Sequence, residues 1–277
     1  MTALEALILG LVQGITEFLP ISSSGHLVIV QRLMGVHEGA FTFDAVIHLG
    51  SLLAVMIALR AELWLMAKSP FGGRTAEARA GRRLMLLVIL GTLPLVVVGL
   101  TLRDLVDRAF GSVYISAFML YFTGALLWFA EKNPRSGQVE TASKLRTLSV
   151  TWRHSLVMGL FQALAVLPGL SRSGVTIAAG MMGGLGREAA ARFSFLLSIP
   201  AIMGAALLEM RTVLREDLSA SLSTEVLVIG TVAAGISSYL AIAILLKFLK
   251  QGSLIGFAYY TWILATVVLA ISYFSRV

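Results

Sequence analysis

The feature that most constrains this chain is a polar, helix-breaking sequence that occurs twice in strongly apolar surroundings. Residues 10–25 and 159–174 align without a gap and are identical at six of sixteen positions. Each copy is an apolar stretch, then a proline (Pro20 or Pro168), then a Ser-Xaa-Ser-Gly sequence. Proline and glycine interrupt a helix, and serine hydroxyls can satisfy the backbone groups that the interruption frees. Two interrupted apolar segments in corresponding halves indicate a binding site at the middle of a membrane.

The composition supports a membrane location. The chain is 57% hydrophobic and only 13% charged, whereas a soluble domain carries about 25% charged residues. The absence of cysteine excludes a disulfide framework, a thiol nucleophile and a cysteine-based metal site. Spanning a bilayer takes roughly 20 apolar residues, and six stretches of about this length predict six spans: 41–59, 84–102, 113–130, 193–210, 226–246 and 254–273.

The two interrupted segments, about 3–35 and 155–186, predict re-entrant helical hairpins because their halves are too short to span a bilayer separately. Each half of the chain then holds one hairpin and three spans. Because three spans are an odd number, the second half starts on the opposite side of the membrane and is inverted relative to the first. The predicted fold is an all-α integral membrane protein with two inverted-topology repeats. It is a single membrane domain over 1–277, with repeat 1 at 1–130, a cytoplasmic linker loop at 131–153 and repeat 2 at 154–277.

The loop charges orient this arrangement in the membrane. Of the 22 lysines and arginines, 15 fall on one side and six on the other, and Arg172 lies in the second interrupted segment. The positive-inside rule places the richer side in the cytoplasm and both termini outside. These basic loops account for the net charge of +7 without nucleic acid as a partner.

Ionisable residues inside a membrane are costly, so they are candidates for function. In the predicted topology the tips of the two hairpins meet, which gathers Glu17, His26 and Arg172 among serine hydroxyls. A planar guanidinium pairs with two phosphate oxygens, and the backbone amides of the Ser171–Gly174 turn can bind an anion. The set therefore suits a phosphate group.

Ser23 and His26 lie three residues apart and share a face if the chain after Ser22 is helical. His26 would then act as a base toward a serine or attack phosphorus itself. Glu17 would hold Mg²⁺ or orient the histidine. A purely structural ion pair between Glu17 and Arg172 is the simpler alternative. His37, His48 and His154 receive no role, and Asp44 is predicted to be interfacial.

The two segments resemble a known family, the bacterial undecaprenyl-diphosphatases or bacitracin-resistance proteins. Gln13-Gly-Ile-Thr-Glu17 is similar to the family's (Glu/Gln)-x-x-x-Glu motif, and Phe18–His26 follows it as in that family. Pro168–Thr176 resembles the family's second motif, Pro-Gly-x-Ser-Arg-Ser-x-x-Thr. Arg192–Pro200 is a further similar stretch, and the resemblance extends over essentially the whole chain.

The resemblance implies an inner-membrane phosphatase that converts undecaprenyl (C55) diphosphate to the monophosphate carrier for cell-wall synthesis. It also implies an active site open to the periplasm, dependence on Mg²⁺ or Ca²⁺, and bacitracin resistance. By position, Glu17 is the motif acid and metal ligand, Ser23 or His26 the nucleophile or base, and Arg172 the phosphate-binding cation. Gln13 stands where many members have Glu. The other predicted substrate-binding positions are Ser22, Ser24, Gly25, Ser171, Ser173, Gly174 and Thr176.

An alternative of a different class is an ion-coupled transporter or flippase of an anionic lipid. Inverted repeats with broken helices are a transporter architecture, and one Arg with one Glu would serve binding without chemistry. The Ser23/His26 pair favours the enzyme, because transport needs no nucleophile. The sequence leaves open which residue attacks, which metal is used, which prenyl lengths are accepted, and whether the chain forms a homodimer.

Overall fold

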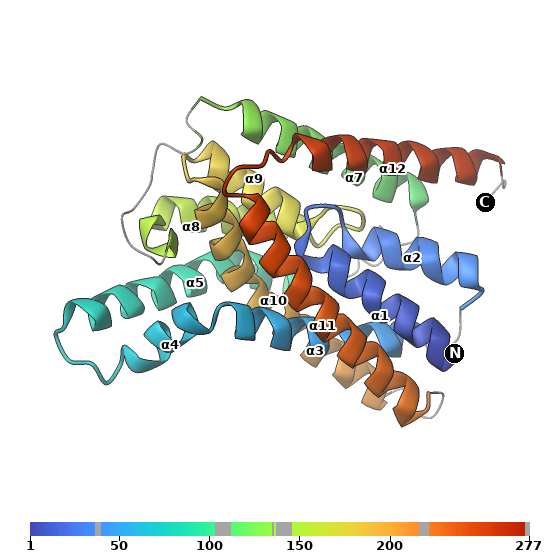
Figure 1. The fold of residues 1–277 in the computed structure, drawn as a ribbon, viewed down its shortest axis with the longest axis horizontal. Coiled ribbons are helices and arrows are strands. Elements are labelled where there is room, and N and C mark those ends of the chain that lie inside the picture. The colour runs from blue at the N-terminus through green and yellow to red at the C-terminus, as the bar shows by residue number, and fades with distance from the viewer. Residues whose placement is uncertain (37–39, 103–111, 135, 137–145, 216–221, 275–277) are drawn as a thin grey trace. The chain divides into compact units, whose positions relative to one another are not determined.

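The computed structural model describes residues 1–36, 40–102, 112–134, 136, 146–215 and 222–274. Within these residues the chain forms eleven α-helices, one short 3-10 helix and no β-strand (Figure 1). The all-helical fold class is therefore confirmed. His37 and residues 137–145 of the predicted linker lie outside the described residues.

Five helices are long and apolar enough to cross a bilayer, and they match five of the six predicted spans. The sixth predicted span, near 41–59, is α3 (Ala40–Ala58), which qualifies only together with α4 (Arg60–Lys68). The two are bent by 75° at the break between them. The five matching helices are α5 (Ala76–Thr101), α7 (Val113–Lys132), α10 (Arg187–Arg215), α11 (Thr224–Phe248) and α12 (Ile255–Phe274).

Both repeated segments are helix–break–helix structures. The first is α1 (Ala3–Phe18) and α2 (Ser23–Met34), and the second is α8 (Trp152–Leu164) and α9 (Arg172–Met182). Each break contains one residue with left-handed backbone, Ser22 at φ 70° and Gly169 at φ 84°. At Gly169 a Cβ atom would lie 2.2 Å from the carbonyl oxygen of Ser116, so only glycine fits.

The chain divides into two compact units. Unit 1 comprises Met1–Leu19, Ser23–Ala58 and Ser198–Leu245. Unit 2 comprises Pro20–Ser22, Leu59–Leu197 and Leu246–Val277. Each unit draws helices from both predicted repeats, and the repeat boundary itself stays a prediction.

The core of unit 1 lies among α1, α2, α3 and α11. Close approach of backbones requires small residues there, because a Cβ on Gly14 would lie 1.9 Å from Ser237 Oγ and one on Gly50 would lie 2.2 Å from the Thr231 carbonyl oxygen. Small residues let helices in a membrane pack closely without a hydrophobic driving force. The buried apolar side chains of this core are Ala6, Leu9, Leu27, Phe43, Ile47, Val226 and Ala234.

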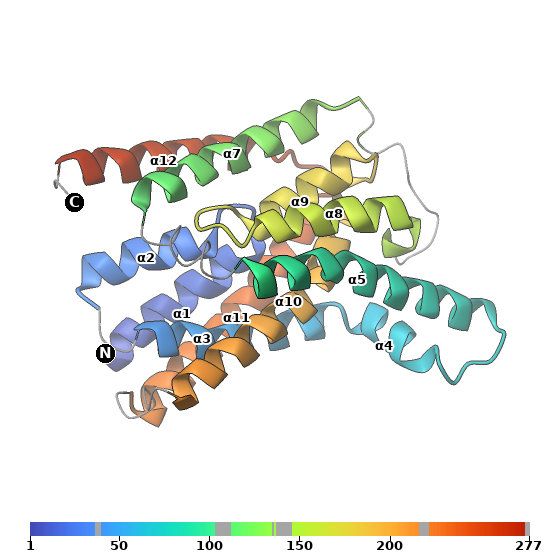
Figure 2. The ribbon, with the colours of Figure 1, turned by 180° about the vertical axis from the view of Figure 1, so that it is seen from behind.

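Two helix pairs organise unit 2. In one pair, α7 and α12 lie side by side (Figures 1 and 2), where Trp262 Nε1 donates to the Tyr121 carbonyl oxygen at 3.0 Å. In the other pair α5 packs on α8, and a Cβ on Gly159 would lie 2.3 Å from the Gly91 carbonyl oxygen. Gly159, which aligns with Gly10 in the repeated sequence, therefore has a packing role.

The first turns of α10 are fixed in unit 2 by ion pairs. Arg187 Nε donates to both carboxylate oxygens of Glu131 at 3.1 Å. Arg192 pairs with Glu188 and with the buried Glu62, each at 3.0 Å. These arginines, counted as loop charges in the sequence, are neutralised by carboxylates within the fold.

Candidate active site

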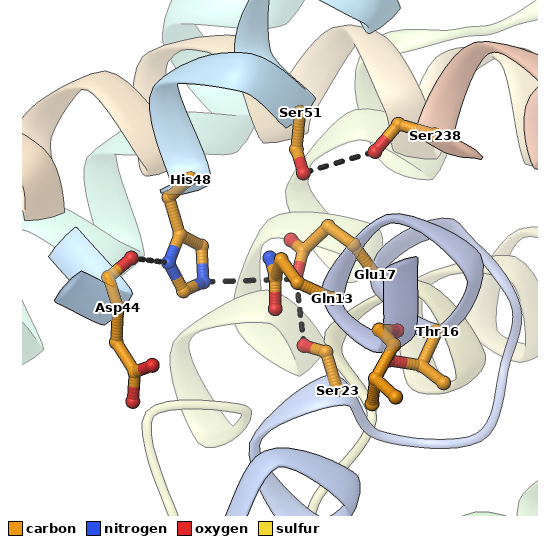
Figure 3. Close-up of polar contacts among 9 residues, drawn as sticks. Gln13, Thr16, Glu17, Ser23, Asp44, His48, Ser51 and Ser238 are labelled. Atoms are coloured by element: carbon orange, nitrogen blue, oxygen red, sulfur yellow. Dashed lines mark hydrogen bonds and ion pairs between the residues drawn. The ribbon is translucent and has the colours of Figure 1, made fainter. Parts of the chain in front are cut away.

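Glu17 is the centre of a polar cluster in unit 1 (Figure 3). It lies in the last turn of α1, and its side chain is only 8% exposed. The last turn of a helix carries a partial negative charge from its unsatisfied carbonyls, and the last turn of α1 has no basic residue. A carboxylate at this end of the helix favours a cationic partner.

Gln13 lies one turn before Glu17 on the same helix and is completely buried. Its Nε2 donates to Glu17 Oε2 at 3.2 Å. Since a carboxylate can only accept, this contact fixes which end of the amide faces Glu17. Among the residues that the structure describes, the buried Gln13 Oε1 has no hydrogen-bond partner. An acceptor oxygen beside a carboxylate is thus left for a cation or a donor from outside the chain.

Ser23 begins α2, and its hydroxyl donates to Glu17 Oε2 at 2.6 Å. The chain reverses between the two helices, which brings Ser23 back to the end of α1 (Figure 3). Ser24, Gly25 and His26 follow in the first turn of α2, and all three are half-buried. Residues after Ser22 are helical as predicted, so Ser23 and His26 lie one turn apart.

His48 of α3, to which the sequence analysis gave no role, lies beside this cluster. Its Nε2 lies 3.9 Å from Glu17 Oε2. Its Nδ1 faces the Asp44 carbonyl oxygen, which only accepts, so Nδ1 carries a proton. Nε2, which faces Glu17, either carries a second proton that can be donated to the carboxylate or is unprotonated. His48 was missed because its apolar stretch is unbroken, although an ionisable residue within a span is itself a signal.

Asp44 has a defined position in the same unit. Gln31 of α2 is buried, and its Nε2 donates to Asp44 Oδ1 at 2.8 Å. This bond joins α2 to α3 one turn before His48. Deeper in the unit, Ser238 of α11 donates to Ser51 of α3 at 2.9 Å (Figure 3). The helix that carries His48 is therefore anchored by polar bonds on both sides of the histidine.

The second motif lies in unit 2, at the start of α9. Ser171 is the N-cap, and its hydroxyl accepts from the Gly174 backbone at 3.1 Å. The Ser171 backbone donates to Thr123 Oγ1 at 3.1 Å, and its hydroxyl contacts Ser173 Oγ at 3.2 Å. An N-cap satisfies one of the amide donors that a helix start leaves free. The Ser171 hydroxyl and the Gly174 amide therefore stabilise the turn that presents Arg172.

Arg172 is the first residue of α9 and is half-buried. Thr176, one turn later, donates to the Arg172 carbonyl oxygen at 2.7 Å and contacts Ser194 Oγ of α10 at 2.6 Å. The predicted substrate-binding residue Thr176 thus links α9 to α10. Gln162 of α8, the counterpart of Gln13, is completely buried, and neither of its amide atoms has a hydrogen-bond partner among the described residues.

The fold therefore brings together Gln13, Glu17 and Ser23 in unit 1, and Ser171, Arg172, Ser173, Gly174 and Thr176 in unit 2. The meeting of the two hairpin tips stays a prediction. In the described part of the chain, no group of three or more His, Cys, Asp or Glu residues is arranged to hold a metal. The contacts described above place the Glu17 carboxylate beside the His48 imidazole and the Gln13 amide.

Comparison with known proteins identifies the family. The family model described as bacitracin resistance protein BacA matches residues 6–267. The undecaprenyl-diphosphatase of Carboxydothermus hydrogenoformans is 40% identical over 272 residues, which is 98% of each chain. That of Desulfosudis oleivorans is 43% identical over 280 residues, covering 97% of this chain and 98% of the relative. That of Methanobrevibacter smithii is 42% identical over 279 residues, covering 97% of each. The resemblance stated from the two motifs is thereby confirmed, and this chain belongs to the bacitracin resistance protein BacA family.

Proposed function

We propose that this membrane protein is an undecaprenyl-diphosphatase, which hydrolyses the C55 prenyl diphosphate to the monophosphate and inorganic phosphate. Relatives of this name align with nearly the whole chain at about 40% identity, and the proposal rests mainly on them. The regenerated monophosphate carries cell-wall precursors, and its supply confers resistance to bacitracin. The transporter alternative is not favoured, because these relatives are named as phosphatases.

The contact between Ser23 and Glu17 supports hydrolysis through a serine nucleophile. The Ser23 hydroxyl donates its proton toward Glu17 Oε2 at 2.6 Å, which leaves the oxygen lone pairs for the substrate. In the proposed step, Ser23 Oγ attacks the terminal phosphorus and its proton passes to Glu17. The bond from that phosphorus to the bridging oxygen breaks, and the bridging oxygen leaves with the prenyl monophosphate.

Water then attacks the phosphoserine and takes the phosphoryl group, while the Glu17 proton returns to Ser23 Oγ. His26, one turn along α2, is the competing nucleophile or base. His48 positions Glu17, since its Nε2 approaches the same carboxylate oxygen that accepts from Ser23. Arg172 of the second motif is proposed to bind the terminal phosphate and to stabilise the charge that develops in the transition state.

A divalent cation, Mg²⁺ or Ca²⁺, fits the residues at Glu17. The carboxylate lies at the negative end of α1 and is almost fully buried, and the Gln13 oxygen beside it has no hydrogen-bond partner in the described structure. Magnesium often uses one or two protein carboxylates and completes its shell with water and phosphate oxygens. Glu17 and the Gln13 oxygen would hold the ion, which when bound would neutralise charge on the diphosphate.

The finer topology is part of the same proposal. The α1–α2 and α8–α9 segments are re-entrant hairpins of two inverted repeats, and the active site opens to the periplasmic side of the bacterial cytoplasmic membrane. Both termini lie outside. The support is the repetition of Pro and Ser-Xaa-Ser-Gly in two helix–break–helix segments, together with the uneven loop charges.

The experiment that tests the function measures phosphate release by the purified, detergent-solubilised chain from C15 and C55 prenyl diphosphates, with Mg²⁺, with Ca²⁺ and with EDTA. We expect metal-dependent release that is lost in Arg172→Ala. Trapping with radiolabelled terminal phosphate in wild type, Ser23→Ala and His26→Ala decides the nucleophile, since only one residue carries the adduct. Well-folded protein that releases no phosphate with either metal would overturn the proposal in favour of transport.

A further inference from the structure

An open pocket of about 860 Å³ lies between α5 and α8 in unit 2, and the proposed function does not use it. Four arginines line it: Arg79, Arg82 and Arg83 from the first turns of α5, and Arg153 from the first turn of α8. The N-terminus of α8 itself opens into it through Thr151 and Trp152. A helix N-terminus carries partial positive charge, so both the side chains and this helix end favour an anion.

Among the residues that the structure describes, no carboxylate pairs with the pocket arginines. Arg82 donates to the carbonyl oxygens of Ser69 and Gly73, and Arg83 donates to those of Leu148 and Val150. Arg79 donates to the Arg74 carbonyl oxygen. A guanidinium has five N–H donors, so these bonds orient the arginines and leave most of their donors available.

Other arginines of the same unit, unlike those of the pocket, form ion pairs with carboxylates. Arg187 pairs with Glu131, and Arg192 pairs with Glu62 and Glu188. Within the described residues, no ion pair is formed by any of the four pocket arginines. Four cations gathered around one pocket repel each other, and an anionic ligand would relieve this repulsion.

Beyond the arginines, the lining that α5 contributes to the pocket is apolar. Leu86, Leu87 and Leu90 follow the arginines along α5, and this helix continues as the most apolar candidate span. Leu86 is 62% exposed, and Trp152, which α8 contributes to the pocket, is 58% exposed. Tryptophan is enriched at the level of lipid headgroups. The pocket is therefore cationic where α5 begins and apolar toward the membrane-spanning part.

We propose that this pocket binds an anionic phospholipid, with the phosphodiester headgroup among Arg79, Arg82, Arg83 and Arg153 and the first part of an acyl chain along Leu86 and Leu90. Basic pockets between transmembrane helices on the cytoplasmic side are a recurrent form of lipid recognition. The positive-inside rule predicts that side for the starts of α5 and α8. A soluble phosphate would use the same cations but would gain nothing from the apolar wall.

The test measures the apparent Kd of the full-length, detergent-solubilised protein for phosphatidylglycerol by native mass spectrometry. Phosphatidylcholine serves as the neutral lipid and inorganic phosphate as the soluble anion. We expect phosphatidylglycerol to bind and phosphatidylcholine to bind much more weakly. Arg79→Gln/Arg153→Gln should weaken phosphatidylglycerol binding about 30-fold, since each basic residue at an anionic surface contributes about 1 kcal/mol and 1.4 kcal/mol is tenfold.

The control is Arg74→Gln/Lys68→Gln, which removes the same charge from exposed positions near the pocket and should leave the Kd within about twofold. If the double pocket variant fails to fold, Arg153→Gln alone suffices, because in the described part of the chain its side chain stacks on Trp152 and forms no hydrogen bond or ion pair, and a loss of about fivefold is expected. Equal losses in control and pocket variants would overturn the proposal. Equal Kd values for phosphatidylglycerol and phosphatidylcholine would also overturn it. So would displacement of phosphatidylglycerol by inorganic phosphate at a concentration close to the Kd of the lipid.

Discussion

The Ser23 hydroxyl and the Glu17 carboxylate meet at 2.6 Å across the break between α1 and α2. One end of this pair belongs to a helix C-terminus and the other to a helix N-terminus, so the break itself creates the contact. The same carboxylate oxygen also accepts from Gln13 and is approached by His48. Any change in Glu17 therefore alters the nucleophile candidate, the predicted metal site and the histidine together.

Glu17→Gln should lower the rate of phosphate release about 10²–10⁴-fold, the usual contribution of a positioned acid or base. The amide keeps the size of the side chain but removes its negative charge. The measurement is kcat for a prenyl diphosphate in detergent. Glu5→Gln is the matched control on the same helix, because Glu5 closes the capping box with Thr2 and Gln can do the same. Equal kcat values for Glu17→Gln and Glu5→Gln would show that Glu17 does not take part in the reaction.

Gln13→Glu should preserve activity while changing the response to metal. A second carboxylate next to Glu17 repels it in EDTA, so the melting temperature should fall without metal and recover with Mg²⁺ more than in wild type. Thermal unfolding with and without Mg²⁺ provides a readout that does not depend on turnover. A loss of activity with no metal-dependent recovery of stability would assign Gln13 to packing.

His48→Ala should lower kcat about 10- to 100-fold, the typical effect of removing a residue that orients a catalytic or metal-binding group. The KM should change little, because His48 is proposed to contact Glu17 rather than the substrate. His154→Ala serves as the histidine control, since the His154 ring accepts from the Thr151 amide and faces the Gly183 carbonyl oxygen in unit 2, away from the Glu17 cluster in unit 1. An unchanged kcat in His48→Ala would show that the contact of His48 with Glu17 has no part in the reaction.

Gly14→Ala should destabilise unit 1 by about 1–3 kcal/mol, because the added methyl group overlaps Ser237 Oγ and the Ala234 carbonyl oxygen. The α1–α11 contact would open, and Glu17 on the same helix would shift. Thermal unfolding in detergent measures the effect. Gly204→Ala, where a Cβ would meet nothing within 4 Å, should be neutral or slightly stabilising. Equal melting temperatures for the two variants would contradict the close packing of α1 on α11.

The sequence by itself determined the helical spans, the two broken segments and most of the proposed catalytic set. These features depend on local properties: the length of apolar runs, the effect of Pro and Gly on a helix, and hydroxyls next to a break. The positions of Glu17, Ser23 and Arg172 within the motifs also carried the family resemblance. Gln13 and Glu17, four residues apart, face each other simply because α1 is a helix.

Only the tertiary structure decided which distant groups meet. His48 lies in an unbroken apolar stretch, where its ionisable side chain marks it as unusual but does not reveal its neighbour; it is placed at Glu17 by the packing of α1 and α3 in unit 1. The same holds for Arg187 with Glu131 and Arg192 with Glu62, which the sequence presents as separate loop charges. Contacts of this kind depend on helix packing over long sequence separations, where small residues such as Gly14 and Gly50 set how closely the backbones approach.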